Sequence, residues 1–191
     1  MSSAPDGAGD GLERAKLVQQ RLYEEDYSAT PEEVEFCLRT FHDYRASRAP
    51  AVDDPVFDEE PEPFLGFEYA LWDLSELLRK YLLRKRRLRG RCGVLDAVES
   101  IVRDKRCGKG RQNFVLILGQ YGKMEYVATY AWGLDDRQII SHCISALTRV
   151  RAPGFRGRME QIRDQSASTL ARREAKAYLK KVNSPNGGST E

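Results

Sequence analysis

The chain has 191 residues, of which 41% are hydrophobic and 31% are charged. This length suits one ordinary domain with a flexible arm, and the composition supplies a core but excludes a membrane-embedded protein. No apolar run approaches the roughly 18–20 residues that cross a bilayer. Residues 1–10 lack the basic start and the apolar stretch of a signal peptide. We therefore expect a soluble, cytoplasmic protein.

The formal net charge of +2 conceals two oppositely charged parts. Residues 1–62 carry 16 acidic and 6 basic side chains, whereas residues 63–191 carry 13 acidic and 25 basic side chains. The near-neutral average is therefore made of an acidic part and a basic part.

Cysteine and histidine usage gives no sign of a disulfide framework or of a metal site. The cysteines are scattered, without a Cys-x-x-Cys motif or a paired Cys/His spacing: Cys37, Cys92, Cys107 and Cys143. A chain of this length with its own core does not need disulfides. The two histidines, His42 and His142, lie a hundred positions apart. The sequence therefore predicts no zinc site and no cofactor.

The first predicted helices lie in the acidic part. Residues 1–10 have the composition of a disordered tail, and residues 12–25 show a loose helical periodicity. The run Thr30-Pro31-Glu32-Glu33 offers an N-cap hydroxyl, a proline at the first helical position and a glutamate three residues after the cap. A second helix is therefore expected over residues 31–45.

A change of composition follows this helix. Residues 47–63 hold four of the eight prolines and a block of carboxylates. Proline removes backbone donors and like charges repel one another, so this segment is not expected to pack into a core. We interpret it as a linker between the acidic part and the basic part.

Helical patterns dominate the rest of the chain, and no proline occurs between Pro63 and Pro153. Apolar residues recur at helical spacing in six segments: residues 65–88, 94–102, 123–132, 136–150, 155–162 and 171–182. The run Phe114 to Leu118 fits a buried strand as well as a helix, because periodicity alone does not decide so short a segment. Its helical neighbours favour a helix. The tail from Asn183 has a disordered composition.

These helices pair into repeated units of a short helix, a turn and a second helix. The second members are expected to begin near Arg111, Arg137 and Ala171, at spacings of 26 and 34 residues. A helical hairpin of this size cannot bury its apolar face alone, so neighbouring hairpins stack. An irregular helical bundle is the alternative, and both interpretations give an all-α fold.

The central unit resembles a known family of helical repeats. Its pattern is Leu118-Gly119-Gln120-Tyr121-Gly122, then Glu125, then Leu134-Asp135-Asp136, then Ala146-Leu147. This pattern is similar to the HEAT repeat, and more closely to the short HEAT variant of phycobilisome-lyase-type proteins. The resemblance covers roughly residues 93–182 and implies an α-α superhelix of stacked hairpins.

The resemblance also gives local expectations. Glycines at positions 119 and 122 allow a tight turn, and Asp135 or Asp136 caps the amides at the next helix start. Two features depart from the family pattern. Gln138-Ile139 stands where the family often shows Val-Arg, and the 34-residue spacing implies an insertion near residues 153–168.

No catalytic motif is present. The chain lacks G-x-S-x-G, G-x-x-x-x-G-K-[ST], H-E-x-x-H and EF-hand spacings. The Gly108-Lys109-Gly110-Arg111 turn could contact an anion, although such turns are more often connectors. We therefore predict a protein without catalytic residues, and an enzyme of unfamiliar type is the least favoured alternative.

The strongest functional signal is a concentration of basic residues. Residues 79–111 hold 13 basic and 3 acidic side chains. Cations near a helix C-terminus complement its dipole, but one or two suffice, and contact with a polyanion is the alternative reason for this density. The candidate polyanion-binding residues are Arg84, Lys85, Arg86, Arg87, Arg89, Arg91, Lys105, Arg106, Lys109 and Arg111. No motif that reads nucleic-acid bases accompanies them.

The acidic segment suggests a further hypothesis. Its carboxylates could fold onto the basic residues and cover them: Asp53, Asp54, Asp58, Glu59, Glu60 and Glu62. Removal of residues 1–62 would then strengthen binding to polyanions.

Aromatic residues are assigned mainly to packing. Trp72 and Trp132 are expected in the core or between helices, and Tyr121, Tyr126 and Tyr130 are expected to be partly buried. If two of these tyrosines were exposed together, they could anchor a partner.

The sequence thus predicts four parts: an acidic helical arm (1–46), a linker (47–63), a HEAT-like domain (64–183) and a disordered tail (184–191). The predicted function is a protein-interaction scaffold or adaptor whose partner is another protein. Binding of DNA, RNA or another polyanion through residues 79–111 is the alternative.

Overall fold

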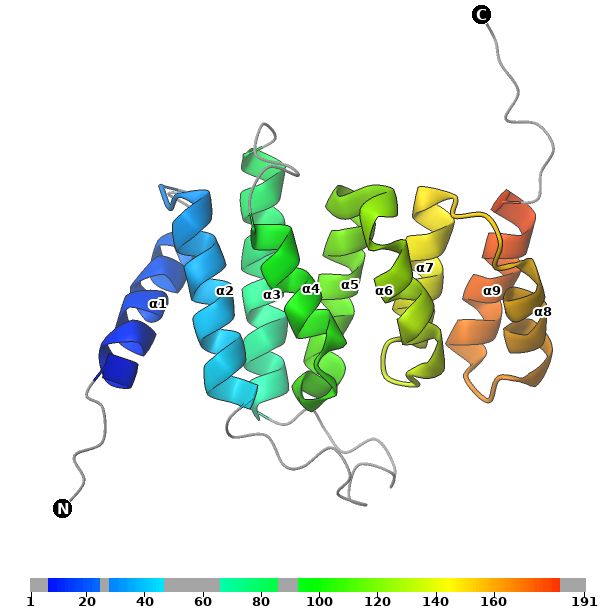
Figure 1. Ribbon diagram of the computed structural model, residues 1–191, viewed down its shortest axis with the longest axis horizontal. Coiled ribbons are helices and arrows are strands. Elements are labelled where there is room, and N and C mark those ends of the chain that lie inside the picture. The colour runs from blue at the N-terminus through cyan, green and yellow to red at the C-terminus, as the bar shows by residue number, and fades with distance from the viewer. Residues whose placement is uncertain (1–6, 25–27, 47–65, 86–92, 183–191) are drawn as a thin grey trace, which may run out of the picture. The chain divides into compact units, whose positions relative to one another are not determined.

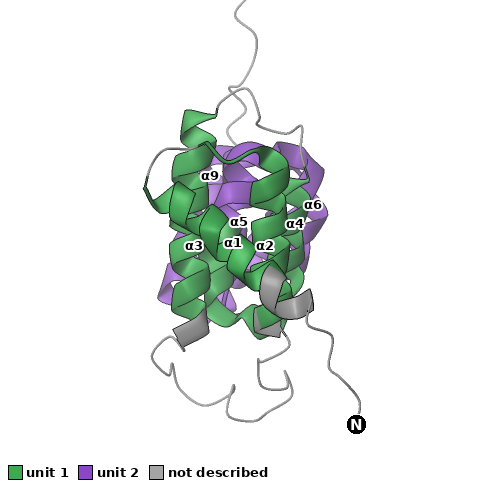
Figure 2. Ribbon diagram, turned by 90° about the vertical axis from the view of Figure 1, so that its left-hand side faces the viewer, with its two compact units in different colours: residues 1–114 green, residues 115–191 purple. Residues whose placement is uncertain are grey.

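The chain folds entirely into helices wherever its structure is described. The computed structural model describes residues 7–24, 28–46, 66–85 and 93–182 (Figure 1), and no strand occurs in these ranges. The predicted all-α fold class is confirmed. The chain divides into two compact units, residues 1–114 and 115–191 (Figure 2).

The described residues of the first unit form the helices α1 (Gly7–Tyr23), α2 (Pro31–Ala46), α3 (Gly66–Arg84) and α4 (Val94–Arg103) and the 3₁₀ segment η3 (Lys105–Arg111). Helix α1 packs against α2 and α3, α2 packs against α4, and η3 packs against α3. The helices that we assigned to an acidic arm therefore lie in the same compact unit as α3 and α4. The predicted linker, residues 47–63, lies outside the described residues.

The start of α2 follows the predicted capping box. The Glu33 amide donates to the Thr30 hydroxyl oxygen at 3.3 Å, and the Thr30 amide donates to a Glu33 carboxylate oxygen at 2.8 Å. These two bonds satisfy amides that have no partner within the helix. The Arg21 guanidinium on α1 bonds Glu33 at 2.8 Å and, as the main cause, holds the pKa of Glu33 below its ordinary value.

Helix α5 (Gln112–Ile117) lies across the division between the two units. It includes most of the apolar run of residues 114–118, so the ambiguous segment is helical, as predicted from its neighbours. Phe114, Val115 and Ile117 are buried in it.

The second unit continues from α5 with shorter helices: the π-helical segment η4 (Leu118–Gly122), the 3₁₀ segment η5 (Lys123–Tyr126), α6 (Val127–Trp132), the 3₁₀ turn η6 (Gly133–Asp135), α7 (Ile140–Val150), α8 (Arg156–Gln165) and α9 (Thr169–Val182). Helix α9 packs against both α7 and α8. The Tyr178 hydroxyl of α9 also donates to the Ala152 carbonyl, which ties α9 to the turn after α7.

The glycines of the repeat-like pattern allow close packing. A Cβ atom on Gly119 would lie 2.8 Å from the Ala146 Cβ atom of α7. On Gly122 it would lie 2.3 Å from the Tyr126 ring. The chain then turns at Lys123, whose φ is +56°. Asp136 accepts a bond from the Gln138 amide at 3.0 Å, but this bond lies in the turn before α7. The N-cap residue of α7 is Ile139, which makes no side-chain cap bond, so the predicted aspartate cap was wrong.

Several predicted helix boundaries were wrong by a few residues. The helix expected over residues 65–88 ends at Arg84, and the helix expected from residue 136 begins at Ile140. The segment 123–132 starts as a 3₁₀ turn before it becomes α6. Apolar periodicity continues through turns that keep apolar residues buried, so it places helices better than it places their ends.

Candidate functional site

Those predicted polyanion-binding residues that the structure describes are not gathered in one place. Arg84 and Lys85 lie at the C-terminal end of α3, and Lys105, Arg106, Lys109 and Arg111 lie in η3. The other four candidates, Arg86, Arg87, Arg89 and Arg91, fall outside the described residues.

The two described groups occupy opposite ends of α3. The Lys109 amide of η3 donates to the Glu68 carboxylate at 2.6 Å, near the first turn of α3. Glu68 and Arg84 are 16 positions apart in this helix, which corresponds to about 24 Å along its axis. The described cations of residues 79–111 therefore do not form one continuous surface.

The structure corrects the prediction that Arg111 binds a polyanion. Its side chain is fully buried. The guanidinium donates from Nε to the Gly108 carbonyl at 2.8 Å and from Nη1 to the Val102 carbonyl at 3.2 Å. Arg111 therefore holds the backbone between α4 and α5 and is not available to a polyanion.

Carboxylates accompany several of the remaining cations. Ion pairs join Arg79 to Glu76 at 2.8 Å, Arg103 to Glu99 at 3.0 Å, and Arg106 to Asp104 at 2.7 Å. A polyanion at η3 would therefore compete with Asp104 for Arg106, which lowers the gain from each contact.

We call Asp104 together with the η3 segment (residues 104–111) the η3 corner. The backbone conformation of this corner depends on a glycine in its sequence. Gly108 has φ +52° and ψ −140°, a conformation that favours glycine. A Cβ atom at this position would overlap the buried carboxylate of Glu68. The glycine thus lets Glu68 reach the Lys109 amide and fix the corner against α3.

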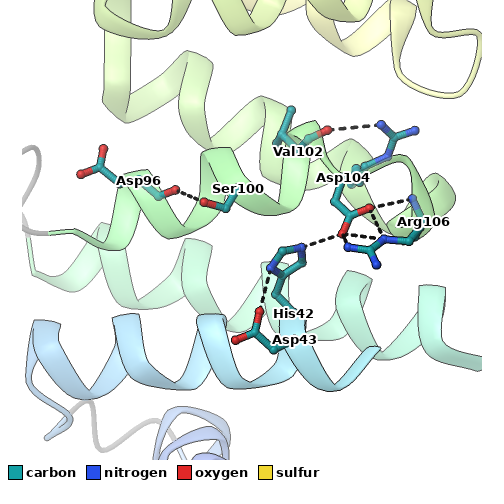
Figure 3. Close-up of polar contacts among 8 residues, drawn as sticks. His42, Asp43, Asp96, Ser100, Val102, Asp104 and Arg106 are labelled. Atoms are coloured by element: carbon teal, nitrogen blue, oxygen red, sulfur yellow. Dashed lines mark hydrogen bonds and ion pairs between the residues drawn. The ribbon is translucent and has the colours of Figure 1, made fainter. Parts of the chain in front are cut away.

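A cluster of potential metal ligands lies at the beginning of the η3 corner. His42 of α2, Asp104 and Cys107 each present a ligand atom, and these atoms all lie within 4.8 Å of one another. The His42 Nε2 atom is 2.9 Å from Asp104 Oδ2, and its Nδ1 atom is 3.5 Å from Asp43 Oδ1. Figure 3 shows the imidazole between these two carboxylates. Among the residues that the structure describes, this is the cluster whose side chains could hold a metal ion.

The electrostatics of the cluster are set by burial and by Arg106. Burial acts to raise the pKa of Asp104, but hydrogen bonds from the Arg106 side chain and backbone and from His42 outweigh it, so this pKa lies below its ordinary value. Burial raises the pKa of the Cys107 thiol to about 12. Without a metal, the cluster therefore contains a carboxylate and a neutral thiol, and a neutral thiol is a poor nucleophile.

One face of α3 exposes aromatic side chains. Tyr69 is 53% exposed, Trp72 is 38% exposed, and Leu83 near the other end is 41% exposed. Positions 69, 72, 76, 80 and 83 share one side of the helix because they are three or four residues apart. The opposite side is buried, with Leu71, Leu74, Leu78 and Tyr81.

The prediction for Trp72 was therefore wrong, and Trp132 of α6 is half-buried. Tyr121, Tyr126 and Tyr130 are buried, so they do not form the exposed anchor considered from the sequence. The apolar stripe of α3 is the sequence feature that could have predicted the exposure of Trp72. Seen down the helix axis, Trp72 lies about 100° from Leu71, about 120° from Leu78 and about 160° from Leu74.

The metal-ligand cluster had no signal in the sequence. Asp104 and Cys107 are close along the chain, but His42 lies 62 positions before Asp104. Only the packing of α2 against α4 brings them together.

No helix of the described segments combines the length and the apolar character that a membrane span requires. Comparisons with models of protein families, with curated proteins and with solved structures find no match to this chain.

Proposed function

We propose that this chain is a protein-interaction scaffold built on a short, HEAT-like α-solenoid, without a catalytic step. The observation that carries the proposal is the exposed aromatic face of α3, with Tyr69 and Trp72 one helical turn apart. Large aromatic side chains contribute much of the energy of protein interfaces, and burying their apolar surface is favourable.

The helix-to-helix contacts support the scaffold part of the proposal. Two pairs of helices that follow one another along the chain pack together, α1 with α2 and α8 with α9. A row of helical hairpins exposes the outer side of each helix, where side chains can vary without loss of the core. The α3 face mixes aromatic residues with Asp73, Glu76 and Lys80, a combination typical of interface rims around apolar anchors.

Site-specific photocrosslinking tests this proposal. A benzoylphenylalanine at Asp73, an exposed position beside Trp72, should form a discrete adduct in an extract of the host cells. The matched control places the same group at Leu170 of α9, which is 42% exposed and lies in the other unit. We expect the adduct from position 73 alone, and we expect its loss when Tyr69→Ala and Trp72→Ala are added.

Two results would contradict the proposal. Identical adducts from positions 73 and 170 would indicate nonspecific contact. An adduct at position 73 that survives removal of both aromatic side chains would show that the α3 face does not supply the binding energy.

Polyanion binding is the alternative proposal, with DNA or RNA as the partner. The observation that favours it is the C-terminal end of α3, where exposed Arg84 is followed by Lys85 and by further arginines in the sequence. Cations at this helix end also complement the helix dipole. A salt series separates the proposals, because affinity that comes from phosphate contacts falls steeply as salt rises.

A further inference from the structure

We propose that His42, Asp104 and Cys107 form a binding site for a divalent transition-metal ion, with Zn²⁺ as the expected ion. The three side chains supply an imidazole nitrogen, a carboxylate oxygen and a thiolate sulfur, which are the three donor types that zinc takes in proteins. Ca²⁺ and Mg²⁺ prefer oxygen ligands alone, so they do not fit this set.

The geometry requires only small shifts of the side chains. At zinc bond lengths of about 2.0–2.3 Å, tetrahedral ligands lie roughly 3.4–3.6 Å from one another. The His42 and Asp104 atoms, 2.9 Å apart, would separate by about half an ångström to admit the ion, and every pair of ligand atoms in the cluster is within 4.8 Å. A shift of about an ångström, within the reach of side-chain rotation, completes the arrangement.

Neighbouring groups hold two of the ligands in place. The Arg106 amide donates to Asp104 Oδ1 at 3.0 Å, which leaves Oδ2 directed at His42. The Asp43 carboxylate faces the other nitrogen of His42. A carboxylate that bonds this nitrogen is a frequent companion of metal-binding histidines, and Asp43, at 3.5 Å and with 82% of its side chain exposed, is near enough to take that role.

Arg106 is the group that opposes metal binding. Its guanidinium bonds both oxygens of Asp104 and places a positive charge next to the site. The Arg106 side chain is 43% exposed, so it can move into solvent when the metal takes Oδ2, while its backbone amide keeps Oδ1. Replacing Arg106 should therefore strengthen metal binding, which a purely structural role of the cluster would not predict.

Binding at this site would join α2 to the η3 corner. His42 lies in the last turns of α2, and Asp104 and Cys107 lie just after α4. Cys107 must lose its proton when the metal binds, so each bound ion releases a proton. Three protein ligands leave a fourth position for water or for a group of a partner.

Cobalt spectroscopy on the full chain, reduced and stripped of metal, tests the proposal. One equivalent of Co²⁺ should give intense visible bands typical of four-coordinate cobalt and a thiolate-to-cobalt charge-transfer band, and Zn²⁺ should displace it. Zinc affinity then follows from competition with a chelator. Cys107→Ser and His42→Ala should each weaken it more than about 100-fold, since loss of an outer partner alone costs 10–100-fold.

Two cysteine variants serve as matched controls. Cys37→Ser keeps a donor to the Ala15 carbonyl, which the thiol contacts at 3.4 Å, and Cys92→Ser removes the cysteine outside the described residues. Both should leave the charge-transfer band and the zinc affinity unchanged. Arg106→Ala should raise the affinity about two- to fivefold, because the ion pair that it removes is exposed and therefore weak.

X-ray absorption at the zinc edge requires no variant and therefore remains decisive if a substitution prevents folding. The wild-type chain with one equivalent of Zn²⁺ should show one sulfur at about 2.3 Å and nitrogen or oxygen ligands at about 2.0–2.2 Å. Absence of a 1:1 complex, a spectrum without sulfur or with several sulfurs, or a charge-transfer band that persists in Cys107→Ser would overturn the proposal.

Discussion

Burial gives Arg111 a structural role that its charge alone would not suggest. The guanidinium is fully buried and donates to two backbone carbonyls, of Gly108 and Val102. Hydrogen bonds from a charged group contribute about 1.5–3 kcal/mol each, and lysine cannot reproduce the fork of donors. We expect Arg111→Lys to lower the free energy of unfolding by about 1.5–3 kcal/mol in urea denaturation.

The control for this prediction is Arg103→Lys. Arg103 is exposed and pairs with Glu99 on the surface of α4, so its replacement should change stability by less than about 0.5 kcal/mol. Equal stabilities of Arg111→Lys and the wild type would show that Arg111 does not support the corner.

His142 is the residue expected to make stability depend on pH near neutrality. It lies partly buried on α7, and burial lowers its pKa although Glu174 of α9 acts to raise it. The unfolded chain then binds a proton at a higher pH than the folded chain does. The stability that the neutral His142 side chain contributes is therefore fully present above the pKa of the unfolded chain, about 6.5. This contribution is lost as the pH falls through the lower pKa of the folded chain.

Replacing this histidine should remove that part of the pH dependence. We expect thermal midpoints of the wild type to fall more than those of His142→Gln between pH 7.5 and pH 5.5. Parallel curves for the two proteins would mean that the imidazole keeps its ordinary pKa in the folded chain.

The contacts of single residues could be predicted from the sequence only where they join residues close along the chain. The capping box of Thr30 and Glu33 was predicted because its bonds join residues three apart. The burial of Arg111 was not predicted, because it depends on the packing of η3 against α3, whereas the exposure of Trp72 could have been predicted from its place outside the apolar stripe of α3.

Helices were predicted well because each has one apolar side. In α4, the buried residues Val94, Val98, Ile101 and Val102 recur at the spacing of a helix face. The 3₁₀ and π-helical segments were not predicted, since they arise where packing tightens or widens a turn at Gly108 or Gly119 and leave no separate periodicity.

Gly119 gives a prediction at the scale of two packed helices. A methyl group at this position would meet the Ala146 Cβ and Cα atoms at 2.8 and 3.0 Å. Alanine normally stabilises a helix by up to about 1 kcal/mol over glycine, but overpacking costs about 1–3 kcal/mol. We expect Gly119→Ala to destabilise the chain in chemical denaturation, because the neighbouring backbone of α7 cannot move away cheaply.

Gly157 is the matched control. It lies in α8, and a Cβ atom there meets nothing within 4 Å. Gly157→Ala should therefore leave stability unchanged or raise it by a few tenths of a kcal/mol. If both substitutions had the same effect, helix propensity would dominate and the close approach at Gly119 would not be needed.

On the scale of the whole molecule, the sequence predicted the helical class but not the grouping of its parts. The proline-rich segment suggested an arm of residues 1–46, whereas α2 packs on α4 in the same unit. That contact also assembles His42, Asp104 and Cys107. Neither result follows from composition, because a linker sequence does not specify whether the helices on its two sides meet.

Charge distribution gives the last prediction. The candidate polyanion-binding residues that the structure describes lie at the two ends of α3, and at the η3 corner Arg106 is paired with Asp104 while Arg111 is buried. If the chain binds a polyanion, the C-terminal end of α3 should therefore supply most of the affinity. Replacing Arg84, Lys85, Arg86 and Arg87 by alanine should abolish binding to a 20-nucleotide DNA strand at low salt.

The matched variant replaces Lys105, Arg106 and Lys109 by alanine at the η3 corner. This variant should lower the affinity for the DNA strand less than about threefold. It removes few cations that are available to phosphates, although the loss of Arg106 leaves the negative charge of Asp104 without its ion pair. Equal, large losses in both variants, with a salt dependence that requires both groups, would mean that one polyanion spans the two ends of α3. Such a result would favour the alternative function over the scaffold, because a shared polyanion track leaves the aromatic face of α3 without a role.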